Sequence, residues 1–221
     1  MKKYLCEFIG TFFLVLTIGC TVIGGGPGVI PPLAIGSMLM VMIFATGHIS
    51  GGHLNPAVTL AVWLRGKCDT SDVPGYLAGQ FLGALAAALV VSILVGPEVM
   101  ASVHPMAITR VAPAFIAEFL GAFAIAFVVL NVATAKANSN NSFYGLAIGF
   151  TVVACAFALG GYAGGAFNPA VAVGITVMGL NAVSNLWIHL IANLAGGAVA
   201  AFTFKAVSNE PVQRDVVSPH E

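Results

Sequence analysis

The sequence predicts an all-α membrane protein with six transmembrane helices, two re-entrant half-helices and two inverted repeats of three helices each. Three observations predict this fold. The 221 residues are 59% hydrophobic and only 7% charged, whereas soluble domains carry about 25% charged residues. Six apolar stretches approach the roughly 20 residues that a helix needs to cross a bilayer. The same sequence landmarks also occur twice along the chain, in the same order.

The six apolar stretches define the expected spans. The first is too long for the core of a signal peptide and has no clear cleavage site, so we expect it to remain as a span. The second is short if it ends at Gly47, and we expect it to begin near Pro31. The six spans are expected at residues 5–23, 33–47, 73–94, 114–134, 143–160 and 183–204.

Two further apolar segments, 56–64 and 169–178, are too short to cross a bilayer alone. Each follows a glycine-rich run. Irregular backbone at membrane depth is tolerated only where protein or a water-filled cavity satisfies its polar groups. These segments therefore predict two half-helices beside a pore.

The basic residues predict the orientation. If the amino terminus is cytoplasmic, only Arg110 faces outward, and such a bias is typical of membrane proteins. An even number of spans then puts both termini in the cytoplasm. A five-span alternative, with two helices merged or one missed, would scramble this bias. The residues that face the cytoplasm in the six-span arrangement are Lys2, Lys3, Arg65, Lys67, Lys136, Lys205 and Arg214.

Three landmarks define the repeat. Glu7 and Glu118 stand in similar segments 111 residues apart, and the segments 51–58 and 164–171 match at a spacing of 113. Gln80 and Asn193 begin a third matching pair at the same spacing of 113. Three crossings per repeat invert the second half relative to the first, which places the functional site near the membrane midplane. We expect a single domain over 1–221, with repeats at about 4–96 and 114–205 and a short polar cytoplasmic tail at 208–221.

The tripeptide Asn-Pro-Ala occurs once in each repeat. Asparagine is a favoured helix N-cap, and proline fits the first helical turn, where no N–H is needed. Each half-helix would then point its amino terminus, with roughly half a positive charge, at the midplane. Together with free asparagine amides that donate to a passing oxygen, this arrangement predicts a pore that excludes cations and hinders proton hopping. The two copies are Asn55, Pro56, Ala57 and Asn168, Pro169, Ala170.

Segment 47–59 resembles the first signature of the aquaporin, or major intrinsic protein, family, and 164–171 resembles the second. Glu7, Glu118 and Gln80 match polar residues of the family's first, fourth and third spans, where they support the loops. The resemblance implies an hourglass-shaped pore in each subunit of a homotetramer, with both motif asparagines facing the pore. It also implies a ladder of carbonyl groups from Gly51, Gly52, His53 and Leu54, and from Gly164, Gly165, Ala166 and Phe167.

The second signature departs from the family pattern, because Val171 stands where the family usually has arginine. The positions of the family's outer selectivity filter then correspond to Ile35, Ala156, Gly165 and Val171. This quartet has no charge, no side-chain donor and no ring, so we expect a wide, apolar filter. It predicts permeation of water together with larger neutral solutes: ammonia, urea, hydrogen peroxide, glycerol or arsenous acid.

Several polar residues allow two interpretations. Glu7 and Glu118 are intramembrane carboxylates, which suit a proton relay or the support of loop backbone. Their symmetric positions favour support, and Gln80 and Asn193 are interpreted in the same way, although many relatives have proline at the Asn193 position. We interpret His189 as a buried histidine with satisfied nitrogens.

His48 and His53 are spaced for a metal or pH-sensitive site, but no third ligand accompanies them, which favours packing against the loop. We therefore expect no metal site and no cofactor. The four cysteines are scattered and are interpreted as apolar filler.

A secondary transporter is the main alternative, because transporters also use inverted repeats and broken helices. The identical starts of the two half-helices and the lack of further intramembrane acids favour a static channel. No general acid–base pair, nucleophile or basic patch points to an enzyme or to a nucleic-acid partner. The short loops and tails predict a bacterial inner-membrane protein, with the lipid bilayer, water and small neutral solutes as its partners.

Overall fold

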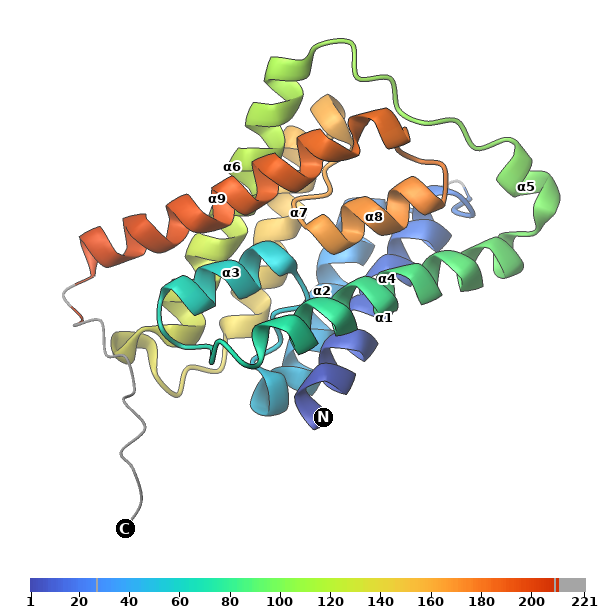
Figure 1. Cartoon of the computed structure of the whole chain (residues 1–221). Coiled ribbons are helices and arrows are strands. Elements are labelled where there is room, and N and C mark those ends of the chain that lie inside the picture. The colour runs from blue at the N-terminus through green and yellow to red at the C-terminus, as the bar shows by residue number, and fades with distance from the viewer. Residues whose placement is uncertain (27, 209, 211–221) are drawn as a thin grey trace.

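The computed structural model describes residues 1–26, 28–208 and 210, and in this part of the chain every regular element is a helix. Six long helical segments are apolar enough to span a membrane. Two short helices, α3 (Pro56–Leu64) and α8 (Pro169–Val177), lie between them (Figure 1). The long helices are α1 (Lys2–Val22), α2 (Pro31–Ser50), α4 (Val73–Val95), α6 (Val111–Val129), α7 (Tyr144–Ala163) and α9 (Leu186–Val207).

These elements confirm the predicted fold class. Helix α2 begins at Pro31, as expected, and runs past Gly47 to Ser50. A π-helical turn, Leu130–Thr134, extends α6, and the 3-10 turn Val183–Asn185 precedes α9. The sequence did not predict the short helix α5 (Pro97–Ala101), which lies in the connection between the two halves. Most of the predicted tail lies outside the described residues, and so does Arg214.

The two halves pack in the same way. Helix α1 packs against α4, and α6 packs against α9, while α2 and α7 meet across the halves. Each half-helix leaves its own repeat to contact the other, because α3 packs against α9 and α8 against α4. Figure 1 shows α3 and α8 end to end in the middle of the bundle, flanked by α9 and α4. The site between the half-helices is therefore built by both repeats.

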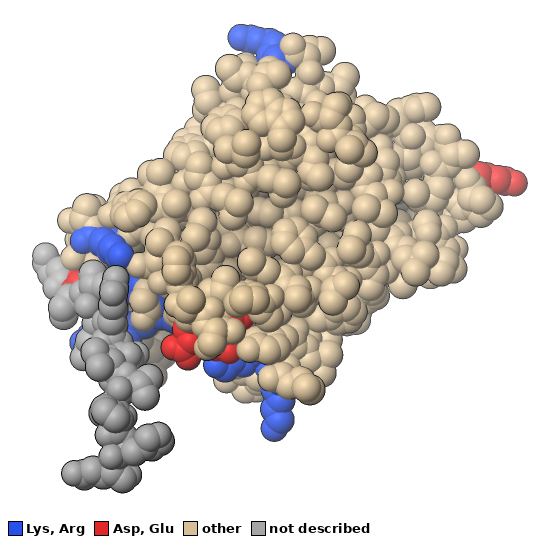
Figure 2. Space-filling view, viewed as in Figure 1, with Lys and Arg blue, Asp and Glu red and all other residues tan. Residues whose placement is uncertain are grey.

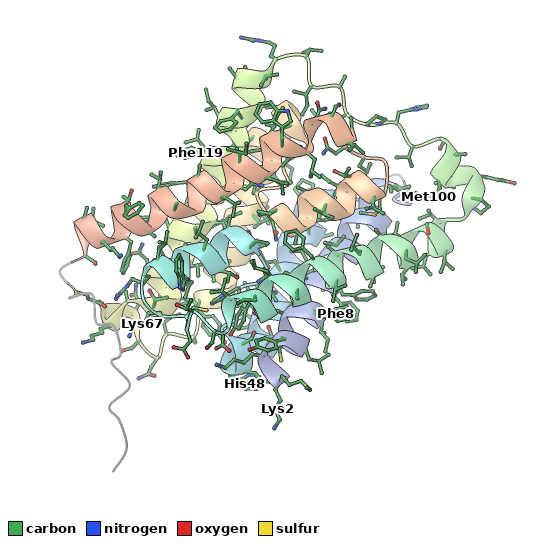
Figure 3. All side chains as sticks on the ribbon, in the orientation of Figure 1. Lys2, Phe8, His48, Lys67, Met100 and Phe119 are labelled. Carbon is green, nitrogen blue, oxygen red and sulfur yellow. The ribbon has the colours of Figure 1, made fainter. Side chains whose placement is uncertain are left out.

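Glycines set the close approach of these helices. A Cβ atom on Gly83 of α4 would lie 2.5 Å from the Phe8 carbonyl oxygen of α1, and one on Gly196 of α9 would lie 2.5 Å from the Phe119 carbonyl oxygen of α6. Figure 3 labels Phe8 on α1 and Phe119 on α6. Small residues that let backbones touch are typical of helix packing in lipid, where burial of apolar surface gives no driving force.

The outer surface is uncharged over most of its area. In Figure 2 charged side chains gather near the ends of the bundle and leave a broad uncharged band between them. Lys2, His48 and Lys67 lie at one end and Met100 at the other (Figure 3). Leu89 and Ile93 on α4 are 63% and 70% exposed. Lipid is the solvent that suits such a surface, as expected for an integral membrane protein.

Candidate pore

The half-helices begin at the two motif asparagines, and each asparagine side chain caps its own helix. The Asn55 Oδ1 atom accepts a hydrogen bond from the Ala57 N–H at 2.8 Å, and the Asn168 Oδ1 atom accepts one from Ala170 at 2.9 Å. Each asparagine also reaches across to the other repeat. Asn55 Nδ2 donates to the Phe167 carbonyl at 3.0 Å, and Asn168 Nδ2 donates to the Leu54 carbonyl at 2.8 Å.

The carbonyls that accept these cross-bonds belong to residues with unusual backbone conformations. Leu54 has a φ of 50° and Phe167 a φ of 48°, in the left-handed region that side chains rarely adopt. A Cβ atom on Gly10 would overlap the Leu54 side chain, and one on Gly121 would overlap the Phe167 ring. Two repeat-related glycines therefore make room for two repeat-related strained residues.

A cavity of about 260 Å³ runs beside both motifs. Asn55 and Asn168 line it, as do both predicted loop segments through Gly52–Leu54 and Gly164–Ala166. Within the described residues, the carbonyls of residues 51–53 and 164–166 accept no hydrogen bond, so they are available to a solute. The remaining wall is aliphatic and includes Leu14, Ile18, Val22, Leu39, Ile43, Val58, Ile125, Val129, Ile148, Val152 and Ile175.

All four residues of the predicted outer filter line this same cavity. They come from three helices and one loop: Ile35 on α2, Ala156 on α7, Gly165 in the second loop and Val171 on α8. These positions are separated by up to 136 residues in the sequence. The structure therefore brings together a quartet that carries no charged or donor side chain. Its role as the narrowest point stays a prediction.

A second, larger cavity of about 1100 Å³ opens at the end of the bundle where α1 begins. Charged residues line it, including Lys3, Lys67 and Asp72. The two cavities share His53 and Val129 as lining residues. His53 of the first loop and Val129 of α6 therefore lie where the two cavities adjoin.

Glu7 lies behind the first loop and is fully buried. Its carboxylate accepts hydrogen bonds from the Ser50 hydroxyl at 2.7 Å, the His53 N–H at 3.0 Å, the Leu54 N–H at 2.6 Å and Gln80 Nε2 at 2.7 Å. Four donors on one carboxylate fix the loop backbone and turn its N–H groups away from the cavity. This geometry gives Glu7 and Gln80 a supporting position.

Glu118 holds the second loop with fewer donors. It accepts hydrogen bonds from the Ala166 N–H at 2.9 Å and the Phe167 N–H at 2.8 Å. His189 Nδ1 lies 3.3 Å from Glu118 without forming a hydrogen bond. The interpretation of His189 as a satisfied histidine is therefore wrong, because neither ring nitrogen forms a hydrogen bond within the described residues. The Asn193 amide also has none, so it does not support the loop as Gln80 does.

The histidine pair of the sequence separates in the structure. His48 is exposed, whereas His53 is buried, and its Nδ1 atom lies 3.2 Å from Thr59 Oγ1. Within the described residues, no group of three or more histidine, cysteine, aspartate or glutamate side chains is placed to hold a metal ion.

Sequence reasoning missed three polar residues of the first loop's support and one buried cation. Ser50, Thr59 and Tyr76 join the Glu7 network, and the first two flank the motif closely enough to have been suspected. Arg65 was counted only as a cytoplasmic charge. Its side chain is 2% exposed, pairs with Glu210 at 2.7 Å and lies 4.9 Å from the centre of the Phe204 ring.

Comparisons with known proteins agree with this architecture. The model of the "Major intrinsic protein" family matches residues 1–204. A "Glycerol uptake facilitator protein-like 6" of Lactiplantibacillus plantarum is 35% identical over 216 residues, covering 95% of this chain and 100% of the relative. "Aquaporin NIP3-1" of Arabidopsis thaliana is 30% identical, covering 100% of this chain and 72% of the relative.

A solved structure has the same fold. The aquaglyceroporin from Plasmodium falciparum superposes with a TM-score of 0.77 at 22% sequence identity, covering 93% of this chain and 96% of that one. The resemblance seen in the two signatures is confirmed by these matches. The chain therefore belongs to the major intrinsic protein family, whose members are membrane channels for water or small solutes and not enzymes.

Proposed function

We propose that this protein is a passive channel that conducts water and small neutral solutes through the 260 Å³ cavity. One observation carries the proposal: both motif asparagines line the cavity at the point where the two half-helices meet. An asparagine amide nitrogen has two hydrogens, and each of these asparagines spends one on the opposite loop. The remaining N–H of Asn55 and of Asn168 can donate to a passing oxygen.

The same arrangement supports exclusion of ions and protons. Two helix amino termini, each with roughly half a positive charge, raise the energy of a cation between them. A water molecule that accepts from both asparagines must direct its own hydrogens away from the pair, which interrupts a chain of proton donors. Helix dipoles are used in this way by other channels.

The apolar quartet supports a broad choice of neutral solutes. No side chain among Ile35, Ala156 and Val171 can form a hydrogen bond, so solutes find their partners on the loop carbonyls. We include glycerol, urea, ammonia, hydrogen peroxide and arsenous acid among the candidate solutes. The name of the bacterial relative, a glycerol uptake facilitator-like protein, adds weight to glycerol.

The contacts of the buried acids favour a channel over a secondary transporter. A coupled transporter needs a site for its driving ion within the membrane. Glu7 and Glu118 are both engaged by loop N–H groups, so both carboxylates serve to hold the loops.

The proposal includes the setting of the channel. We place both termini in the cytoplasm, because Arg110 stands apart from the other basic residues. The match to a bacterial relative supports a bacterial inner membrane. We also propose the homotetramer that the family resemblance implies. Native mass spectrometry of the detergent-purified protein tests the assembly, and cysteine labelling in spheroplasts tests the orientation.

Stopped-flow light scattering on proteoliposomes tests the function. We expect water flux with a low activation energy, close to that of free diffusion, and solute flux that rises linearly with concentration and ignores sodium and proton gradients. Saturable flux that follows an ion gradient would favour the transporter, and vesicles no more permeable than empty ones would refute both.

A further inference from the structure

The two repeats support their loops with different residues. The repeat spacing of 113 pairs Ser50 with Ala163 and Thr59 with Ala172. It also pairs Tyr76 with His189 and Gln80 with Asn193. Every one of these replacements is smaller, and three of them, all except Gln80 to Asn193, remove a hydroxyl group. The second repeat therefore lacks polar atoms at positions where the first repeat uses them.

In the first repeat the hydroxyls of Ser50 and Thr59 link the loop to the residues that support it. Ser50 Oγ accepts from the Gly52 N–H at 3.1 Å and donates to Glu7 at 2.7 Å. Thr59 Oγ1 accepts from Gln80 Nε2 at 2.9 Å and donates to the Asn55 carbonyl at 3.1 Å. Each of these hydroxyls thus bridges a donor and an acceptor that form no direct hydrogen bond with each other.

In the second repeat the equivalent groups have no partner within the described residues. The Gly165 N–H, which corresponds to that of Gly52, donates no hydrogen bond. Asn193 Nδ2 and both His189 nitrogens also form no hydrogen bond, although both side chains are 0% exposed and His189 Nδ1 lies 3.3 Å from the Glu118 carboxylate. The amide oxygen of Gln80 in the first repeat and that of Asn193 in the second both lack a hydrogen-bond partner within the described residues. The two repeats therefore differ in their amide N–H donors and in the histidine ring.

Unpaired buried donors such as Asn193 Nδ2 are rare, because such a group loses its hydrogen bonds to water and gains none in the protein. Buried water relieves that cost where a site is polar and offers two to four partners. The missing hydroxyls and the shorter side chains remove side-chain atoms at the same two places. A water molecule can both donate and accept at each place, as the hydroxyls of Ser50 and Thr59 do in the first repeat.

We propose that two water-binding sites lie behind the second loop, in place of the hydroxyls that Ser50 and Thr59 provide in the first repeat. The first water bridges the Gly165 N–H and the Glu118 carboxylate. The second bridges Asn193 Nδ2 and the Asn168 carbonyl, beside the His189 ring. The second loop is thus held partly through water, in addition to its direct hydrogen bonds to Glu118, whereas the first loop has protein hydroxyls at both places. This proposal does not depend on which solute the channel conducts.

A high-resolution cryo-EM or crystal map of the native protein tests the proposal directly. We expect one density peak within hydrogen-bonding distance of Gly165 N and Glu118, and another beside Asn193 Nδ2 and the Asn168 carbonyl. The substitutions Ala163→Ser and Ala172→Thr should each replace one peak by their own hydroxyl and leave the other in place.

Radiolytic labelling in ¹⁸O-water gives an independent readout, because bound water generates hydroxyl radicals beside buried side chains. We expect His189 to be labelled in the native protein despite its burial, and labelling to fall at least about threefold in Ala172→Thr. Val173→Thr adds a hydroxyl on the same helix at a neighbouring position and should leave the labelling unchanged. A native map without density at these positions overturns the proposal, as does a native His189 that takes up no ¹⁸O.

Discussion

Asn55 donates a hydrogen bond to the carbonyl of Phe167, 112 residues further along the chain and 3.0 Å away. Asn168 returns the same bond to Leu54 at 2.8 Å. Each asparagine thus has three tasks: it caps its own helix, holds the opposite loop and offers one N–H to the cavity. The two loops cannot move independently, because each is held by the helix of the other repeat.

Replacing Asn168 by aspartate should open the channel to cations. The carboxylate adds a negative charge between the helix termini and cannot donate to the Leu54 carbonyl. We expect measurable sodium or proton leak in proteoliposomes loaded with a pH-sensitive dye, where the native protein shows none. Asn181→Asp is the matched control, because Asn181 is also buried but does not line the 260 Å³ cavity. An Asn168→Asp channel that leaks neither sodium nor protons would contradict the electrostatic account.

Replacing Val171 by arginine should narrow the outer filter and introduce donors. The long guanidinium side chain would project into the cavity that Val171 lines. We expect glycerol and urea permeability to fall at least about tenfold, equivalent to about 1.4 kcal/mol in barrier height, with a smaller change for water. Stopped-flow measurement of all three solutes on one preparation checks this, and Val171→Ala should lower none of them. Equal losses for water and glycerol would place the narrowest point elsewhere.

Replacing Glu7 by glutamine should destabilise the first loop. The amide keeps one accepting oxygen, while its NH₂ group faces donors such as the His53 and Leu54 N–H groups, which cannot rotate away. We expect the free energy of unfolding to fall by about 1–3 kcal/mol, which would appear as a lower unfolding temperature in detergent. Glu98→Gln, at an exposed position on α5, should leave the temperature within about 1 °C. If Glu7 served only as a proton relay, the unfolding temperature would not change.

Replacing Gly121 by alanine should disturb the second loop from behind. The added methyl group overlaps the Phe167 ring, and Phe167 cannot shift without moving the carbonyl that Asn55 holds. We expect overpacking to lower the free energy of unfolding by about 1–3 kcal/mol. We also expect the water permeability of proteoliposomes to fall. Gly161→Ala, with no atom within 4 Å of the new Cβ, should be neutral or slightly stabilising. Unchanged stability and water permeability in Gly121→Ala would show that the loop tolerates displacement.

Asp72 should contribute stability that depends on pH. The hydrogen bond from Lys3 holds the pKa of Asp72 below its ordinary value, and Tyr4 adds a second donor at 2.9 Å. A folded-state pKa below the unfolded value of about 3.9 gives stability that is complete at neutral pH and is lost as the pH falls through the folded-state pKa. We expect Asp72→Asn to lower the unfolding temperature by about 1–3 °C at pH 7 and to have a smaller effect near pH 3, because Asp72 is then closer to its folded-state pKa. An equal effect at both pH values would exclude the ion pair as its cause.

The sequence predicted the features that depend on local pattern. Apolar length predicted the spans, and the asparagine and proline at each motif predicted helix starts at Pro56 and Pro169. It also predicted the positions of Glu7 and Glu118 behind the loops. It could not predict that the second repeat leaves His189 and Asn193 without partners, because polarity in a sequence does not reveal whether a partner lies within reach.

The sequence by itself determined that the chain is a membrane protein of two inverted repeats with a broken helix in each, because burial in lipid requires apolar length and internally satisfied backbone. Only the tertiary structure decided how the broken helices meet. The cross-bonds of Asn55 and Asn168, the cavity shared by Ile35 and Val171, and the burial of Arg65 all depend on contacts between distant segments. Such contacts follow from the packing of one repeat against the other, which no local pattern encodes.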